Sequence, residues 1–250
     1  RASGLLWCVR WCARPVHPSG ECSRIAGVSA KLKKLSDLSK RGPHRVMVGD
    51  LGYTGLPGKV YTPAEGKDLP GIAFGHDWMK NVGDYHRTLR HLASWGFAVA
   101  APDTETGVNP DHRGLAADLD TCLQILAGVR LGNGNISVSP GKLAVVGHGM
   151  GGGAAVLTAV DNPRVKAVAS IFPANVAPSA VEASRNLFTP GMIVGPGEDG
   201  DSLFDPGNPA KLAYNWAGDV VYRAIKKGDQ QSFSEDGLSL IHISEPTRPY

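Results

Sequence analysis

The sequence predicts an α/β fold with a mostly parallel central sheet and helices on both of its faces. Two observations favour this class. Short continuous apolar segments alternate with longer segments of helical periodicity, a pattern typical of buried parallel strands joined by helices. In addition, the segment 143–160 reads as a strand that runs through a glycine-rich turn directly into a helix. The 250 residues fit one domain of ordinary size.

The first half of the domain shows its elements in order. Residues 31–41 predict a short basic helix, which Gly-Pro at 42–43 ends. Short alternating segments at 46–50 and 58–61 predict an antiparallel pair of strands. Residues 71–74 (GIAF) form an apolar strand between proline and glycine, and 85–95 carry apolar residues at helical spacing.

The second half continues the alternation. A buried strand at 97–101 (FAVAA) precedes a helix at 114–129, whose apolar residues recur every three or four positions. Cys122 lies in that apolar stripe, so we expect it to be buried. The remaining elements are predicted as strands at 143–146, 167–172, 192–194 and 220–225 and as helices at 154–160 and 211–216.

Composition excludes several classes of protein. With 42% hydrophobic residues and a net charge of only +3, the chain is not intrinsically disordered and lacks the basic excess of a nucleic-acid-binding domain. No apolar run approaches the ~18 residues that a membrane span needs. Three of the four cysteines fall within the first 22 residues, which favours a reducing, cytoplasmic location over a disulfide framework. We therefore expect no metal, cofactor, nucleic-acid or membrane partner, and the sequence does not indicate the oligomeric state.

Both ends of the chain differ from the domain between them. Residues 1–30 show no structural periodicity and are predicted to be a disordered or non-native extension; translation from Val28 would explain most of it. The tail at 238–250 (LSLIHISEPTRPY) resembles a translated sequencing adapter, so we expect a foreign or disordered segment there. The predicted domain is therefore 31–237, a fragment whose natural C-terminal helix is missing.

The segment Gly147-His148-Gly149-Met150-Gly151 has the spacing of the nucleophile elbow G-x-S-x-G, with glycine in the middle. Glycine has no side chain, so no covalent acyl-enzyme can form at residue 149. Gly147, Gly149 and Gly152 also satisfy the dinucleotide-binding pattern G-x-G-x-x-G. That alternative needs an early βαβ unit and an acidic residue about 20 positions later, which the sequence does not provide.

From about residue 31 to residue 237 the chain resembles the dienelactone hydrolase-like branch of the α/β-hydrolase superfamily. It is also similar to cutinase-like polyester hydrolases. The segments that carry the resemblance are the elbow, GIAFGHDW (71–78), GFAVAAPD (96–103), GMIVGPGED (191–199) and VVYRAIKKGDQQSF (220–233). The resemblance implies an α/β-hydrolase fold with a Ser-His-Asp triad above the sheet.

The resemblance also implies where the triad positions fall. Gly149 stands at the vacated nucleophile position, and Asp199 matches the acid position, with Asp201 as the runner-up. Gln231 stands at the vacated histidine position, with Gln230 as the one-residue alternative. Two of the three catalytic groups are therefore absent, and a serine could not be activated without a base.

The loop at 75–78 corresponds to the family's oxyanion loop. Its donors are expected from around Asp77 and from Met150, because an oxyanion hole uses the amide that follows the nucleophile. His76 and Trp78 are expected to border the pocket, although His76 could instead cap the end of its strand. His148 flanks the elbow, and local packing is its preferred role.

Taken together, these features predict a dienelactone hydrolase- or esterase-like protein that is catalytically inactive and retains a pocket for a small ester- or lactone-like ligand. The alternative is an active hydrolase, or a lyase, that uses non-standard residues such as His76 with Asp199. A third interpretation is a fold retained only for assembly. The remaining histidines at 86, 91 and 112 are expected to be solvated.

Overall fold

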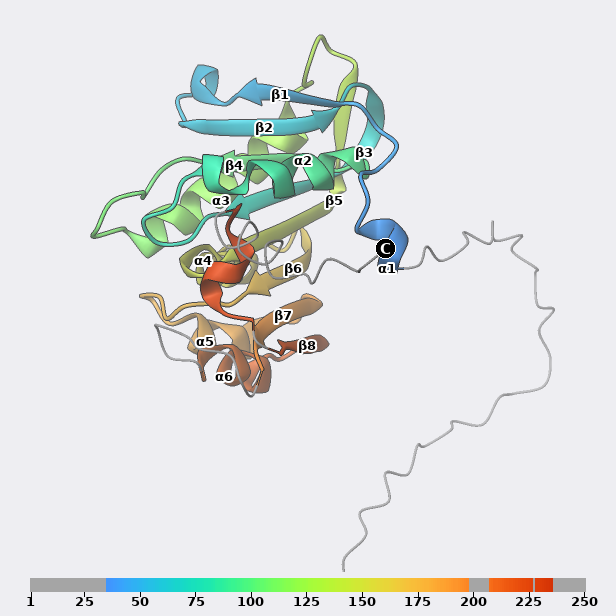
Figure 1. Ribbon diagram of the computed structural model, residues 1–250. Helices are drawn as coiled ribbons and strands as arrows, with labels where there is room; N and C mark the ends of the chain where they lie inside the picture. Colours follow the sequence, from blue (N-terminus) through green and yellow to red (C-terminus); the bar gives the residue numbers. More distant parts are fainter. Residues whose placement is uncertain (1–34, 198–206, 227, 236–250) are drawn as a thin grey trace, which may run out of the picture.

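The computed structural model describes residues 35–197, 207–226 and 228–235. They form an eight-stranded sheet in the order β1-β2-β4-β3-β5-β6-β7-β8 with helices packed against it (Figure 1). The pairs β1–β2 and β2–β4 are antiparallel, and every other neighbouring pair is parallel. The predicted α/β-hydrolase fold with a mostly parallel sheet is therefore confirmed. The predicted extensions 1–30 and 238–250 lie outside the described residues.

The elements occur in the predicted order. The strands are β1 (Val46–Asp50), β2 (Gly58–Pro63), β3 (Gly66–Gly75), β4 (Ala98–Pro102), β5 (Ile136–His148), β6 (Val165–Ile171), β7 (Gly191–Pro196) and β8 (Val220–Ile225). The helices are α1 (Leu35–Leu38), α2 (His86–Ser94), α3 (His112–Gly128), α4 (Met150–Asp161), α5 (Ala180–Ala183) and α6 (Asn208–Asn215). Four short 3₁₀ turns complete the described fold: η1 (Gly52–Thr54), η2 (Val82–Tyr85), η3 (Ser184–Asn186) and η4 (Gln230–Phe233). The helix α5 and the four 3₁₀ turns were not predicted, although the predicted helix at 85–95 includes the last residue of η2.

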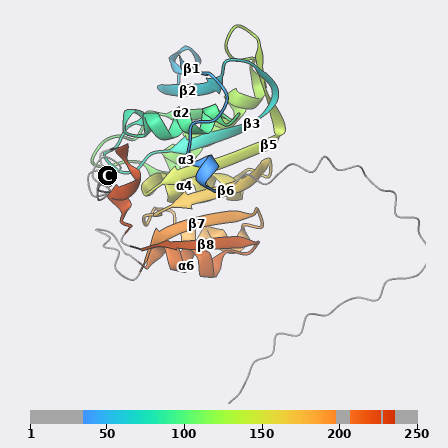
Figure 2. The ribbon, with the colours of Figure 1, turned by 45° about the vertical axis from the view of Figure 1, so that its right-hand side comes forward.

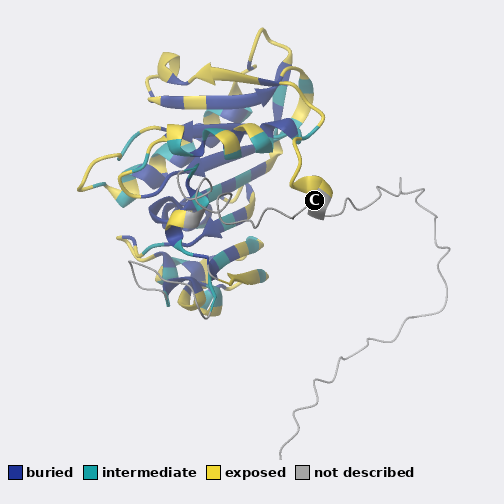
Figure 3. Ribbon diagram, viewed as in Figure 1, coloured by how far each residue is buried: buried dark blue, intermediate teal, exposed yellow. Residues whose placement is uncertain are grey.

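Two apolar clusters hold the layers together. Helices α3, α4 and α6 pack on one face of the sheet around residues such as Leu119, Val145 and Ile193, all of which are fully buried. Helix α2 covers part of the other face, where its Leu89 belongs to the same buried cluster as Phe74 of β3. Figures 1 and 2 show these layers in two views of the ribbon. In Figure 3, which colours the ribbon by burial, the interior strands are largely dark blue. The Cys122 side chain is buried, as predicted, and burial raises the pKa of its thiol.

Helix α2 leaves the second face open over β7 and β8. The register places Val146, Ala169, Met192 and Val221 side by side across four strands on that face. Met192 and Val221 are 42% and 52% exposed. Among the described residues these side chains form an exposed apolar patch beside the last strand.

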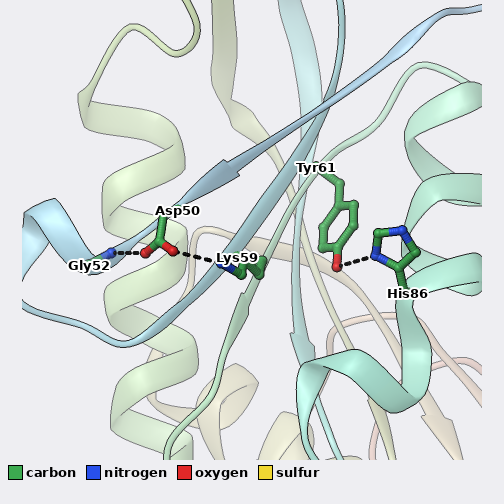
Figure 4. A network of polar contacts seen from close by, with 5 residues as sticks. All are labelled: Asp50, Gly52, Lys59, Tyr61 and His86. Carbon is green, nitrogen blue, oxygen red and sulfur yellow. Dashed lines mark hydrogen bonds and ion pairs between the residues drawn. The ribbon is translucent and has the colours of Figure 1, made fainter.

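A set of polar contacts supports the antiparallel end of the sheet (Figure 4). Asp50 Oδ2 accepts from Lys59 Nζ at 2.7 Å, and its Oδ1 accepts from the Gly52 amide at 2.7 Å. The Lys59 bond is the main reason that the pKa of Asp50 is lowered. Tyr61 Oη lies 3.1 Å from His86 Nδ1, and burial raises the pKa of Tyr61 to about 12. The Tyr61–His86 contact connects β2 to α2, and His86 is half-buried and not solvated as expected.

Candidate functional site

The elbow at the end of β5 keeps its backbone geometry although its middle residue is glycine. Gly149 has φ 54° and ψ −116°, a conformation that residues with side chains adopt rarely and at an energetic cost. Its amide donates to the Ile171 carbonyl at 2.9 Å, and its carbonyl accepts from the Ala174 amide at 2.9 Å. Helix α4 begins at the next residue, Met150. The strand–turn–helix expected of a nucleophile elbow is therefore present.

The space that a side chain at position 149 would fill is taken by Asp77. A Cβ atom built on Gly149 would overlap the Oδ1 and the Cγ of Asp77. Asp77 follows the end of β3, which lies beside β5 in the sheet. The carboxyl group of one strand's loop thus occupies the place of a nucleophile on the neighbouring strand's elbow.

The Asp77 carboxylate accepts the hydrogen bonds that an oxyanion would receive. Its Oδ1 accepts from the backbone amides of Met150 and Trp78, both at 2.8 Å. Its Oδ2 accepts from Gln230 Nε2 at 2.6 Å. Met150 is the first residue of α4, so the carboxylate also lies at the positive end of a helix dipole. Asp77 therefore caps α4 from a distant part of the chain.

Below Asp77 lies a buried pair, Tyr85 and His148. Tyr85 Oη accepts from the Asp77 amide at 3.1 Å and lies 2.8 Å from His148 Nδ1. Burial lowers the pKa of His148, an effect that the nearby Asp77 carboxylate only partly opposes. Burial also raises the pKa of Tyr85. Both groups are therefore held neutral, and the predicted packing role of His148 agrees with these contacts.

A pocket of about 390 Å³ opens at the elbow. Trp78, Val108, Pro110 and Met150 give it apolar walls, and the Asp77 carboxylate lies among them. The Trp78 side chain is held by a bond from its Nε1 to the Val108 carbonyl at 2.9 Å. The other lining residues are Asn109, His112, Ala174, Asn175 and Gln230. Both the volume and the apolar walls with a few polar groups are typical of small-molecule sites.

Several predicted site residues lie elsewhere. His76 is fully buried, and its Nδ1 and Nε2 lie 2.8 and 2.7 Å from the carbonyls of Asp77 and Thr104. The prediction that His76 borders the pocket is therefore wrong, because both ring nitrogens face backbone oxygens. Asp199 and its runner-up Asp201 fall outside the described residues.

The histidine position needs a correction of one residue. Gln231 is exposed, whereas Gln230 is 8% exposed, lines the pocket and donates to Asp77. The structure thus brings the alternative, Gln230, to the elbow in place of Gln231. Both residues belong to η4, whose turn directs them to opposite sides; this turn follows β8 in Figure 1.

Sequence reasoning missed two features of the pocket. The oxyanion donors were expected around Asp77. Instead, the Asp77 side chain accepts from the Met150 amide, and the Asp77 amide donates to Tyr85 Oη. His112 was expected to be solvated, but it lines the pocket, and its Nδ1 accepts from the Ala177 amide at 3.0 Å. The Asp111-His112 start of α3 gives a sequence signal for a helix N-terminus and none for a pocket.

Two other features of the described residues lie apart from this chemistry. A hollow of about 590 Å³ lies between α3 and α4, lined by Arg113 and Arg164 together with aspartate and apolar residues, and it does not include the elbow. Within the described ranges, no group of three or more His, Cys, Asp or Glu side chains is placed to hold a metal ion. In the same ranges no helix combines the length and the apolar character that crossing a membrane requires.

Comparison with known proteins agrees with the geometry. Residues 36–216 match the family described as PET hydrolase-like. The chain is 32% identical over 188 residues to a bis(hydroxyethyl) terephthalate hydrolase from Streptomyces coelicolor, covering 70% of this chain and 56% of that protein. It is 29% identical over 169 residues to cutinase est1 of Thermobifida alba, covering 67% and 54%. A cutinase of Thermobifida fusca is 26% identical over 208 residues. The chain thus spans little more than half the length of the first two relatives.

Proposed function

The chain belongs to the PET hydrolase-like family of the α/β-hydrolase superfamily, and from this premise we propose that it is an inactive member that retains a small-molecule pocket. One observation carries the proposal: the Asp77 carboxylate fills the nucleophile space above Gly149 and takes up the amides of Met150 and Trp78. The elbow position itself therefore carries no attacking side chain, and its oxyanion donors bond an internal acceptor.

Each part of the usual ester hydrolysis meets an obstacle here. Acyl transfer needs a side-chain nucleophile, and residue 149 has none. A serine would need a base, and among the described residues the group that stands at the histidine position is the amide of Gln230. A tetrahedral intermediate needs donors about 2.7–3.1 Å from its oxygen, and those donors already bond Asp77.

The pocket supports the binding half of the proposal. Its apolar walls can hold the body of a small molecule, as the sites of ester-cleaving relatives must hold their substrates. An ester could lie there only with its carbonyl oxygen away from the Met150 amide. The alternative of an active hydrolase that uses His76 receives no support, since neither ring nitrogen of His76 faces the pocket.

Hydrolysis of p-nitrophenyl butyrate and of bis(hydroxyethyl) terephthalate tests the proposal. We expect no turnover above the reaction without protein, and no labelling of the unmodified chain by a fluorophosphonate. Asp77→Asn is the matched variant, because it keeps the shape of the group and removes its charge. Turnover at ordinary enzyme rates, about 1–10³ s⁻¹, would show that another nucleophile or an activated water works in the pocket.

A further inference from the structure

We propose that the pocket at the elbow prefers organic cations, meaning small amines or quaternary ammonium compounds with an apolar body, over carboxylates and other oxyanions. The inference rests on the proposed function, since it assumes that the pocket holds its ligand without cleaving it. It concerns the charge of the ligand, which the family resemblance does not determine.

The first argument is the charge that lines the pocket. Asp77 is 7% exposed, and its three hydrogen-bond donors, the amides of Trp78 and Met150 and the side chain of Gln230, are all uncharged. None of the ten described residues that line the pocket is a lysine or an arginine. The N-terminus of α4 contributes only about half a positive charge, so the described residues that line this end of the pocket carry a net negative charge.

This negative charge is opposite in sign to the partial positive charge that an elbow presents to a ligand when its backbone amides are free. Two convergent amides at a helix N-terminus attract an anion, which is how such a site stabilises an oxyanion. In this chain the anion is supplied internally by Asp77. A carboxylate ligand would therefore approach a like charge in a partly buried pocket, which is unfavourable.

The second argument is the remaining acceptor capacity. A carboxylate has about four acceptor positions, and the described donors to Asp77 number three. A protonated amine can donate an N–H to the fourth position as a charge-assisted bond, whereas a quaternary ammonium, which has no N–H, gains only the attraction between opposite charges. A neutral ligand could donate there as well, but without the attraction between opposite charges.

The third argument is the wall beside the carboxylate. Trp78 lines the pocket, and its indole nitrogen is bonded to the Val108 carbonyl, which fixes the side chain. A cation near the face of an indole ring is attracted by the negative charge of that face. Val108, Pro110 and Met150 offer apolar contact for the body of the ligand. A benzylammonium-sized compound suits a volume of about 390 Å³.

Three non-hydrolysable probes of similar size test the charge preference: benzyltrimethylammonium, its neutral isostere neopentylbenzene, and phenylacetate. Their affinities for the full chain are measured at pH 8 and low salt by chemical-shift titration of backbone amides. We expect benzyltrimethylammonium to bind at least tenfold more tightly than neopentylbenzene. We expect phenylacetate to bind more weakly than either.

Two variants of one residue separate charge from shape. Asp77→Asn should reduce the affinity for benzyltrimethylammonium to that of neopentylbenzene and leave the neutral probe unchanged. Asp77→Ala frees the amides of Met150 and Trp78, so phenylacetate should bind at least tenfold more tightly than to the unmodified chain. Asp103→Asn is the matched control, because it removes a charge after β4 from a residue that does not line the pocket. Thermal melting establishes that each variant is folded.

Equal binding of cation and neutral probe, or a cation preference that survives Asp77→Asn, would overturn the proposal, as would the absence of binding by all three probes. The ester assays of the unmodified chain test the proposed inactivity separately from the charge preference. Ordinary hydrolytic turnover would refute the proposed inactivity, whereas the charge preference is measured with probes that have no ester bond. The two failures are therefore distinguishable.

Discussion

At the residue scale, the Asp77 carboxyl group fills the space that a side chain at position 149 would need, so the residue at each position limits which residues fit at the other. A serine at 149 would overlap the Asp77 carboxyl group. We therefore expect Gly149→Ser alone to give no measurable ester hydrolysis, both for this reason and because the described residues place the Gln230 amide, not an imidazole, at the histidine position. In an Asp77→Gly/Gly149→Ser background, adding Gln230→His should raise kcat for p-nitrophenyl butyrate about 10²–10⁴-fold, the usual contribution of a general base.

The matched control in that background is Gln231→His. Because Gln231 is exposed and Gln230 lines the pocket, the histidine at 231 should give little of this gain. Asp199→Asn in the Gln230→His variant then tests the acid position, which stays a prediction. An equal or larger rate with histidine at 231 would contradict the placement of η4.

A second residue-scale prediction concerns acid stability. Burial lowers the pKa of His148 in the folded protein, so between the folded pKa and the unfolded value near 6.5 the unfolded chain binds more protons. Stability should therefore be fully present above about pH 6.5 and fall as the pH is lowered toward the folded pKa. Urea unfolding from pH 8 to pH 5 measures this, and a single proton accounts for at most about 1.4 kcal/mol per pH unit.

The comparison protein is His148→Gln, which removes the titrating ring. The free energy of unfolding of this variant should change less with pH across the same interval. The difference in slope from the unmodified chain should be at most about 1.4 kcal/mol per pH unit. If both proteins lose stability in parallel, another group carries the acid sensitivity and His148 is not held neutral by burial.

The residues of the site differ in how far sequence could predict them. Gly149 and Met150 followed from the elbow spacing, because that pattern itself specifies a turn between strand and helix. Asp77 was placed in the right loop, but its side-chain role depends on a contact across 73 positions to Met150. The choice between Gln230 and Gln231 depends on the direction of one turn, which local pattern does not determine.

At the element scale, α4 begins at Met150, four residues earlier than predicted. Three consecutive glycines read as a turn because glycine is a poor helix former, costing about 1 kcal/mol per residue relative to alanine. Here they lie inside the helix because a side chain would not fit: a Cβ on Gly151 would overlap the backbone of Gly75. Tertiary packing of α4 against β3 therefore overrides propensity.

This close approach predicts the result of adding one methyl group. Gly151→Ala should destabilise the protein by about 1–3 kcal/mol, the usual cost of overpacking, despite the better helix propensity of alanine. Gly128→Ala, at the end of α3 with open space around its Cβ position, is the control and should be neutral or gain up to about 1 kcal/mol. Urea denaturation measures both. A stabilising Gly151→Ala would mean that α4 does not pack this closely.

At the scale of the whole molecule, the order and class of the elements were predictable because buried parallel strands read as apolar runs separated by helices. The coverage of the two faces was harder to predict, since it depends on which helix crosses which strands. Helix α2 covers one part of its face and leaves β7 and β8 open there.

Neighbouring residues of β7 test this asymmetry between the faces. Met192 lies on the open face and is 42% exposed, whereas Ile193 points into the cluster beneath α6 and is fully buried. Met192→Lys should change the free energy of unfolding by no more than about 0.5 kcal/mol. Ile193→Lys should cost at least about 3 kcal/mol, because a charge replaces a packed side chain. Similar losses for both would show that the face over β7 is covered.

The most direct measurement of the central claim is the proton chemical shift of the Met150 and Trp78 backbone amides, compared between the unmodified chain and Asp77→Asn. Both amides donate to a carboxylate at 2.8 Å, so both protons should resonate downfield in the unmodified chain. Replacing the charge by a neutral amide should move both upfield, while amides of β1, at the edge of the sheet, stay unchanged. Amide protons at Met150 and Trp78 that do not respond to Asp77→Asn would show that the carboxylate does not occupy the oxyanion donors, and the account would be wrong.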